Sequence, residues 1–229
     1  MRKAIASFLA IIICLSLCAC SRKDRIDNTP TEFDLSKEAF NRITLAYLST
    51  NEYSQDLTLL LTMDFMDFMY DESDLHLIAS TLFIEQVHIE KAVANLCGKS
   101  QYSASEKMWC SLVQRYGNYR TAFTNVFFEA YKCSGIVDEI NAQLNAAKDL
   151  VKTLSNDYSS YEHYYTLKEY FTNAVAFNAL CCNPRGDLEQ INHNFESYRA
   201  NARRIFLELN YVFNDSISGL DEYAAAMNR

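Results

Sequence analysis

Glycine and proline are scarce in this chain, with five Gly and two Pro among 229 residues. Enzymes that hold phosphate or expose a nucleophile use glycine-rich turns for it, and the motifs GxSxG, GxxxxGKS/T, HExxH and GxGxxG do not occur. So few glycines do not build the loops that such sites need. The alternating apolar pattern of strands is missing as well. These absences argue against nucleophilic and phosphate-binding enzymes and favour a chain made of helices.

Two further features are missing beyond residue 20. No later apolar run approaches the roughly 20 residues that a membrane-spanning helix requires. An excess of positive charge is also missing, because 21 Lys and Arg stand against 29 Asp and Glu, for a formal charge of −8. We therefore expect a body outside the membrane and no nucleic acid among its partners.

The most informative feature that is present lies in the first twenty residues. A basic start (residues 2–3) precedes an apolar run (residues 4–17) that is too short to span a bilayer, which is typical of a secretory signal peptide. The end of this segment, with Leu17, Ala19 and Cys20, resembles the lipobox of bacterial lipoproteins. In that family the signal peptidase cleaves before a cysteine that carries lipid.

The resemblance implies residues 1–19 as the signal peptide and Cys20 as the lipidated amino terminus, with palmitate among its acyl chains. A cut before Cys18 is the alternative, disfavoured because bulky Leu17 would then occupy the small-residue position. The polar residues 20–33 would form a tether between lipid and fold. A serine after the cysteine implies the outer membrane, on its periplasmic or surface face, if the host is diderm. Membrane contact would rest on the lipid alone.

Helical periodicity and capping signals predict five helices after the tether. The first begins at Asp34 and runs toward Tyr70, with a bend or break expected at residues 50–54. Ser103 and Glu106 predict a capping box before the third. The other expected helices cover residues 75–97, 104–155, 158–182 and 187–212, with a short amphipathic tail at 217–227.

The predicted third helix carries the strongest structural signal. Every position of two heptad seams is apolar or aromatic, and the seams read Trp109, Tyr116, Phe123, Ala130, Val137, Leu144, Val151 and Leu112, Tyr119, Val126, Cys133, Ile140, Ala147, Leu154. The pattern predicts one continuous helix over residues 104–155. The expected all-α fold is an elongated antiparallel helical bundle in which two three-helix bundles, at about 34–130 and 131–229, share that helix, in outline like spectrin repeats. The alternative is a bundle in which the helix bends near Gly135.

Five cysteines remain once the signal is removed and Cys20 is lipidated: Cys97, Cys110, Cys133, Cys181 and Cys182. Their spacing matches no zinc site. Cys133 and Cys181 lie equally far from a turn near Asp157, so an antiparallel pair of helices would bring them level, and we predict a disulfide between them. Cys97 and Cys110 are out of register and are expected to be unpaired. The state of Cys182 is left open.

Metal-binding patterns are present only in part. Met63, Met66 and Met69 recur at every third residue, a spacing with which thioethers hold Cu(I), although packing is the favoured interpretation. Glu85 and His88 form an ExxH, but a di-iron bundle needs a second ExxH and two further Glu. We expect no metal or other cofactor.

Tyrosines crowd the start of the predicted fourth helix and cover more than one of its faces. Exposed tyrosines are common in interfaces, so the best candidate for a partner surface is formed by Tyr158, Tyr161, Tyr165 and Tyr170. The sequence as a whole favours a non-enzymatic, lipid-anchored scaffold or adaptor for an envelope protein. A ligand or metal carrier, with the methionines or tyrosines lining its site, is the alternative. The oligomeric state is open.

Overall fold

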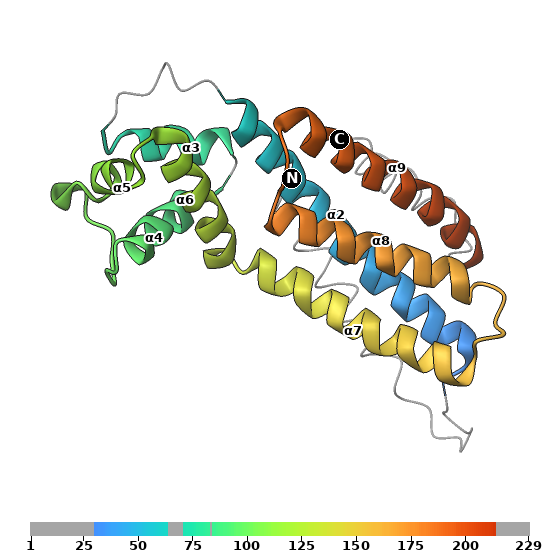
Figure 1. The fold of residues 1–229 in the computed structure, drawn as a ribbon. Helices are drawn as coiled ribbons and strands as arrows, with labels where there is room; N and C mark the ends of the chain where they lie inside the picture. Colours follow the sequence, from blue (N-terminus) through green and yellow to red (C-terminus); the bar gives the residue numbers. More distant parts are fainter. Residues whose placement is uncertain (1–29, 64–70, 83, 214–229) are drawn as a thin grey trace. The chain divides into compact units, whose positions relative to one another are not determined.

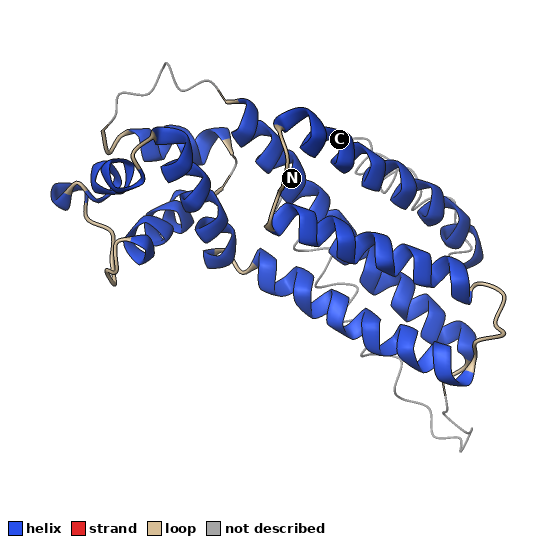
Figure 2. Ribbon diagram, in the orientation of Figure 1, coloured by secondary structure: helices blue, strands red, loops and turns tan. Residues whose placement is uncertain are grey.

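The computed structural model describes residues 30–63, 71–82 and 84–213, and contacts divide the chain into a leading segment, 1–31, and a helical unit that starts at Glu32 (Figure 1). Within the described residues all regular structure is helical and no strand occurs, which confirms the predicted all-α class (Figure 2). The predicted sites at Met66 and Met69 and the tail at 217–227 lie outside the described residues.

Four long helices form a bundle: α2 (Glu32–Thr62), α7 (Ile136–Asp157), α8 (Tyr164–Cys182) and α9 (Leu188–Phe213). Helix α2 contacts the other three, and short connections make α7, α8 and α9 successive antiparallel neighbours (Figure 1). Helices α2 and α9 are antiparallel, because the start of α2 contacts the end of α9 (Phe33 against Phe213) and the end of α2 contacts the start of α9 (Thr58 against Asn192). The bundle therefore alternates in direction from α2 through α7 and α8 to α9.

Between α2 and α7 the chain forms a second group of helices, here called the helical insertion (residues 71–133). It contains α3 (Asp74–Thr81), α4 (Gln86–Leu96), the short 3-10 helix η1 (Ala104–Glu106), α5 (Met108–Tyr116) and α6 (Tyr119–Cys133). The insertion joins the bundle where α2 ends and α7 begins. There, Nη1 of Arg120 donates a hydrogen bond to the carbonyl oxygen of Leu61, 2.8 Å away.

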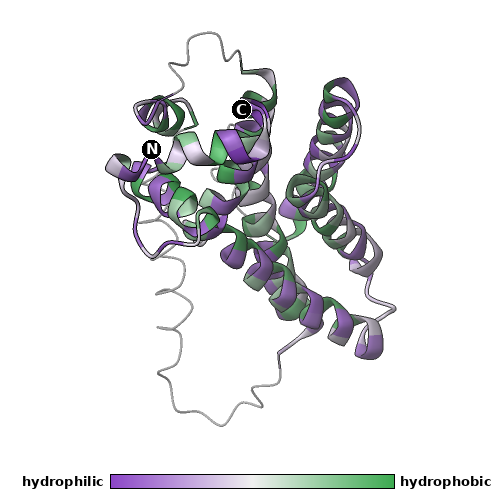
Figure 3. Ribbon diagram, turned by 60° about the vertical axis from the view of Figure 1, so that its left-hand side comes forward, coloured by the Kyte–Doolittle hydropathy of each residue, from purple (hydrophilic) through white to green (hydrophobic). Residues whose placement is uncertain are grey.

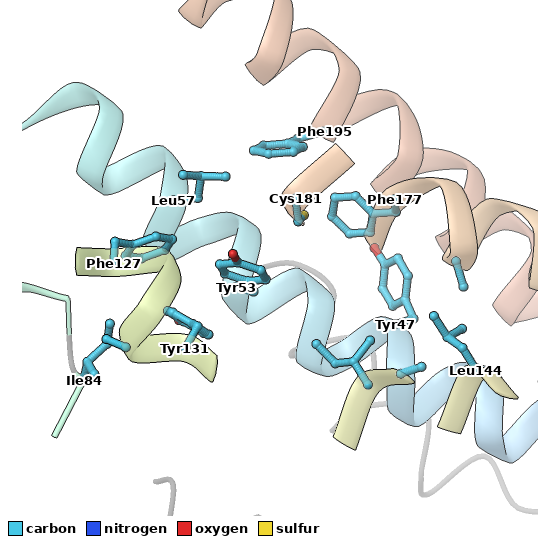
Figure 4. Close-up of a cluster of buried hydrophobic side chains, with 14 of the residues drawn as sticks. Tyr47, Tyr53, Leu57, Ile84, Phe127, Tyr131, Leu144, Phe177, Cys181 and Phe195 are labelled. Carbon is cyan, nitrogen blue, oxygen red and sulfur yellow. The ribbon is translucent and has the colours of Figure 1, made fainter. Parts of the chain in front are cut away.

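One hydrophobic core runs through both groups of helices. Aromatic rings make up much of it: Tyr47 and Phe177 meet in the bundle, while Tyr53 of α2 contacts Phe127 and Tyr131 of the insertion (Figure 4). Apolar residues gather on the facing sides of the helices and polar residues on their outer sides (Figure 3). Burial of these apolar faces stabilises the helices. Capping contributes less, since few of the helix ends carry a side-chain cap.

The predicted continuous helix over residues 104–155 is wrong. The chain is interrupted at Lys107, Gly117 and Gly135, whose φ angles of 48°, 73° and 82° are left-handed and cannot continue a right-handed helix. Gly117 ends α5, and the side chain of Asn118 caps α6 by accepting a hydrogen bond from the backbone N–H of Thr121 at 2.8 Å. The alternative, a helix that bends near Gly135, agrees better with the structure, because the chain breaks at Gly135 and α7 begins after it.

The predicted division into sub-bundles 34–130 and 131–229 also differs from the structure. Helix α2 packs with α7, α8 and α9, so the chain's first and last helices share one bundle and the middle helices form the insertion. Helix α2 begins at Glu32, inside the predicted tether, and continues through residues 50–54 without dividing. The helix predicted over residues 75–97 is two helices, α3 and α4.

One acidic side chain at the start of the insertion, that of Glu72, links it to the start of α5. The carboxylate of Glu72 accepts hydrogen bonds from the hydroxyl of Tyr102 and from the backbone N–H groups of Trp109 and Cys110, at 3.3 and 3.1 Å for the last two. These N–H groups open α5, where a negative charge is stabilising. The expected capping box at Ser103 is not formed, since the Ser103 side chain makes no cap bond.

Candidate functional site

The predicted disulfide is contradicted by the structure, in which Cys133 and Cys181 are separate thiols. Cys133 ends α6 and lies near Asn95, with 3.5 Å between its Sγ and Nδ2 of Asn95. Cys181 is fully buried, and its Sγ lies 3.9 Å from the carbonyl oxygen of Thr50. Equal distance from the turn does not bring the two cysteines together, because the break at Gly135 separates Cys133 from α7.

The four tyrosines predicted as a partner surface do not share one face. Tyr170 is fully buried and contacts Phe40, while Tyr158 and Tyr161 are half-buried against the core. Tyr165 is exposed to 70% and is the only one of the four that lies open to solvent. The predicted surface is thus reduced to Tyr165, because the other rings fill space between helices.

The predicted metal ligands are not brought together either. Met63 is half-buried against the core. Glu85 and His88 pair with each other at 3.6 Å, and Glu85 is largely exposed. Nowhere in residues 30–63, 71–82 and 84–213 do three His, Cys, Asp or Glu side chains gather in a group that could hold a metal ion.

Tyr165 leads to a different candidate site, a groove between α8 and α9. Two adjoining hollows of about 480 and 610 Å³ follow the line between these helices and share Asn173, Tyr198 and Asn201. We call this surface the α8/α9 groove; its lining is completed by Tyr165, Lys168, Glu169, Thr172, Ala176, Ser197, Ala200 and Arg204. Its smallest lining side chains are those of Ala176, Ser197 and Ala200.

An ion pair joins the two walls of the groove. Nη2 of Arg204 on α9 lies 2.5 Å from Oε1 of Glu169 on α8, and the same nitrogen donates to Oδ1 of Asn201 at 3.0 Å. Glu208 approaches Arg204 from the next turn at 3.8 Å. The charge of Arg204 is therefore compensated within the protein.

Asn173 has unusual surroundings for a buried amide. Only 7% of the residue is exposed, it lines both hollows of the groove, and its Oδ1 has no hydrogen-bond partner. Buried polar groups are almost always hydrogen-bonded. This oxygen is itself buried, so it is an acceptor that the protein leaves unfilled and that a ligand in the groove reaches once the side chain turns. Neighbouring rings fix the site, since Tyr198 stacks on buried Phe177 with 5.8 Å between the ring centroids.

The sequence interpretation selected Tyr165 but missed the rest of the groove. Asn173 offered a signal, because it precedes Ala174 and follows Tyr170 by three residues on the buried face of α8, where a polar amide is uncommon. The α9 residues offered none, since Asn201 and Arg204 look like an ordinary solvated helix face. Pairing of α8 with α9 is what makes the groove.

Among the described residues, none of the helices is both long and apolar enough to cross a membrane. Models of known protein families, curated proteins and solved structures were compared with the chain, and none of them matches it.

Proposed function

We propose that the chain is a lipid-anchored, non-enzymatic scaffold or adaptor of the bacterial cell envelope. The observation that carries this proposal is the lipobox-like end of the first twenty residues, closing at Cys20, only a short polar stretch before the helical unit begins at Glu32. Such an arrangement joins an acyl anchor to a folded body through a tether. The anchor supplies an address and leaves the body free to bind a partner.

The order of the helices supports the adaptor role. The tether enters at the first residue of α2, and the helical insertion joins the bundle at the other end of α2. Helix α2 has 31 residues, so at 1.5 Å per residue it separates these two points by about 45 Å. The proposal is that α2 acts as a spacer of that length between the point where the tether joins the fold and the insertion.

The insertion carries exposed apolar side chains suited to a protein partner. Leu77 of α3 is exposed to 40% and Val87 at the start of α4 to 60%. Protein interfaces cover apolar side chains of this kind, and we take these two as the partner-binding side of the insertion, although exposed apolar residues also lie on the bundle. The acidic chain meanwhile avoids anionic headgroups, which leaves membrane attachment to the lipid.

Site-specific photo-crosslinking in intact cells tests the adaptor proposal. A photoreactive residue at Val87 is expected to capture one discrete envelope protein, whereas the same residue at Val175, exposed on α8 of the bundle, should not capture it. A partner captured equally at both positions, or at neither, would contradict binding through the insertion.

A ligand carrier is the second candidate, and the α8/α9 groove is the observation that favours it over a metal carrier. Elemental analysis of the purified protein separates these two: the proposal predicts no stoichiometric copper or iron, and finding either would favour a metal carrier.

A further inference from the structure

We propose that the α8/α9 groove binds a neutral oligosaccharide. The inference concerns a small ligand, and it does not depend on the lipid anchor or on the partner proposed for the insertion. It rests on the shape of the groove, the unpartnered amide oxygen of Asn173 and the exposed ring of Tyr165.

The groove offers the two kinds of contact that a sugar needs. Tyr165 is exposed to 70% and is braced by the ring of Tyr164, 5.1 Å away between centroids, so it presents an aromatic surface to the apolar side of a sugar ring. Asn173 and Asn201 bring amide groups to the hydroxyl-bearing side. The unfilled Oδ1 of Asn173 accepts a hydrogen bond from a sugar hydroxyl once its side chain turns toward the ligand.

Charge in the groove favours a neutral ligand. Arg204 is held by Glu169 at 2.5 Å and approached by Glu208 at 3.8 Å, so its charge is not offered to an anion. Lys168 adds a second positive charge to the lining, and the two cations are matched in number by Glu169 and Glu208, so the groove and its edge carry no net charge. An anionic ligand would have to break the pair between Arg204 and Glu169, whereas hydroxyl groups add hydrogen bonds to it without separating the charges.

The size of the groove favours more than one sugar unit. The two hollows, of about 480 and 610 Å³, are adjacent and are open to solvent along the helices. Because both hollows are shallow, an extended ligand that lies along the helices fits them better than a compact one that must be enclosed. A chain of two or three sugar rings can follow such a groove, with one ring over Tyr165 and another beside Tyr198.

Calorimetric titration of the full-length protein in detergent with chitotriose and with maltotriose tests the proposal. At least one of these neutral trisaccharides should bind, and Tyr165→Ala should weaken that binding about tenfold or more, in line with the loss of one aromatic contact. Tyr211→Ala is the matched control, because Tyr211 is exposed to 85% on α9 and does not line the groove. That variant should bind like the wild type.

Asn173→Ala separates a binding role from a structural one. Since the amide oxygen has no partner, its removal should leave the melting temperature unchanged or raise it, and it should weaken binding about tenfold. The proposal is overturned if neither trisaccharide binds at millimolar concentration. It is also overturned if binding survives both Tyr165→Ala and Asn173→Ala, or if Asn173→Ala lowers the melting temperature and leaves affinity unchanged.

Discussion

Tyr53 of α2 stacks on Tyr131 of α6, with 4.3 Å between the ring centroids and 24° between the planes. Both residues are buried, and the hydroxyl of Tyr131 donates a hydrogen bond to Asp56, one turn further along α2. The pair joins the four-helix bundle to the helical insertion at a point where the aromatic core is continuous. The scaffold role proposed above requires a fixed joint of this kind between the bundle and the insertion.

Truncation of this joint should destabilise both parts of the helical unit. Tyr53→Ala removes a buried aromatic ring, so we expect the free energy of unfolding to fall by about 3–5 kcal/mol. Hydrogen exchange should quicken in α6, although the substitution lies in α2. Tyr211→Ala, on an exposed side chain, should change stability by less than about 0.5 kcal/mol. Unchanged exchange in α6 would mean that the insertion folds independently of the bundle.

Gly135→Ala distinguishes the broken helix from the continuous one. The φ of Gly135 is +82° and an added Cβ meets no atom within 4 Å, so backbone strain alone should destabilise the variant by about 1–2 kcal/mol. In a continuous helix the same change would stabilise by up to about 1 kcal/mol. Ala142→Gly, at an exposed position inside α7, calibrates the helix propensity in the same urea titrations. A more stable Gly135→Ala variant would contradict the break.

The seams of residues 104–155 show how far periodicity predicted the fold. Every seam residue is buried except Tyr116, Cys133 and Val137, which are half-buried and stand beside the breaks at Gly117 and Gly135. The pattern thus identified the inner faces correctly, because each helix buries the face that its apolar residues define. It missed the breaks, since a glycine off the seam does not interrupt an apolar pattern. Gly117 followed by Asn118 was a usable signal, as a C-cap before an N-cap.

Glu72 should be essential to the start of α5. Glu72→Gln removes the negative charge that accepts hydrogen bonds from Tyr102, Trp109 and Cys110, and we expect a loss of about 1–3 kcal/mol in unfolding free energy. Tyr102→Phe removes only one of these hydrogen bonds and should cost about 1 kcal/mol. Chemical denaturation measures both. Equal stability of wild type and Glu72→Gln would show that solvent caps α5 equally well.

The adjacent thiols of Cys181 and Cys182 should behave differently. Burial raises the pKa of both thiols above the usual 9.0, and more so for Cys181, which is fully buried, whereas Cys182 is exposed. Iodoacetamide should therefore modify Cys182 in the folded protein and Cys181 only on unfolding. Cys182→Ser identifies the labelled site by mass spectrometry. Rapid labelling of Cys181 would contradict its burial.

Alkaline pH should weaken the fold. Burial raises the folded-state pKa values of Cys181 and Tyr53 above their usual 9.0 and 10.0, so both groups favour the protonated form when folded. Their contribution to the free energy of unfolding is fully present below those usual pKa values and is lost as pH rises through the folded-state pKa values. The urea midpoint should thus be lower at about pH 10.5 than at about pH 8. A midpoint that stays level or rises would contradict this.

The candidate site was less predictable than the fold because it depends on which helices are neighbours. Tyr165 and Tyr170 look alike in sequence, yet one is open to solvent and the other is buried against α2. Arg204 of α9 becomes part of a groove only because α8 lies beside it, where Glu169 pairs with it across the groove. Composition and periodicity describe one helix at a time, so they do not show this pairing.

The lipid anchor is the central claim, and mass spectrometry of the amino-terminal peptide, isolated from membranes, tests it most directly. The peptide should begin at Cys20 and carry diacylglycerol and acyl chains, and Cys20→Ala should leave the membrane with its helical content unchanged. A peptide that begins elsewhere without lipid would contradict the claim. So would a Cys20→Ala protein that stays in carbonate-washed membranes.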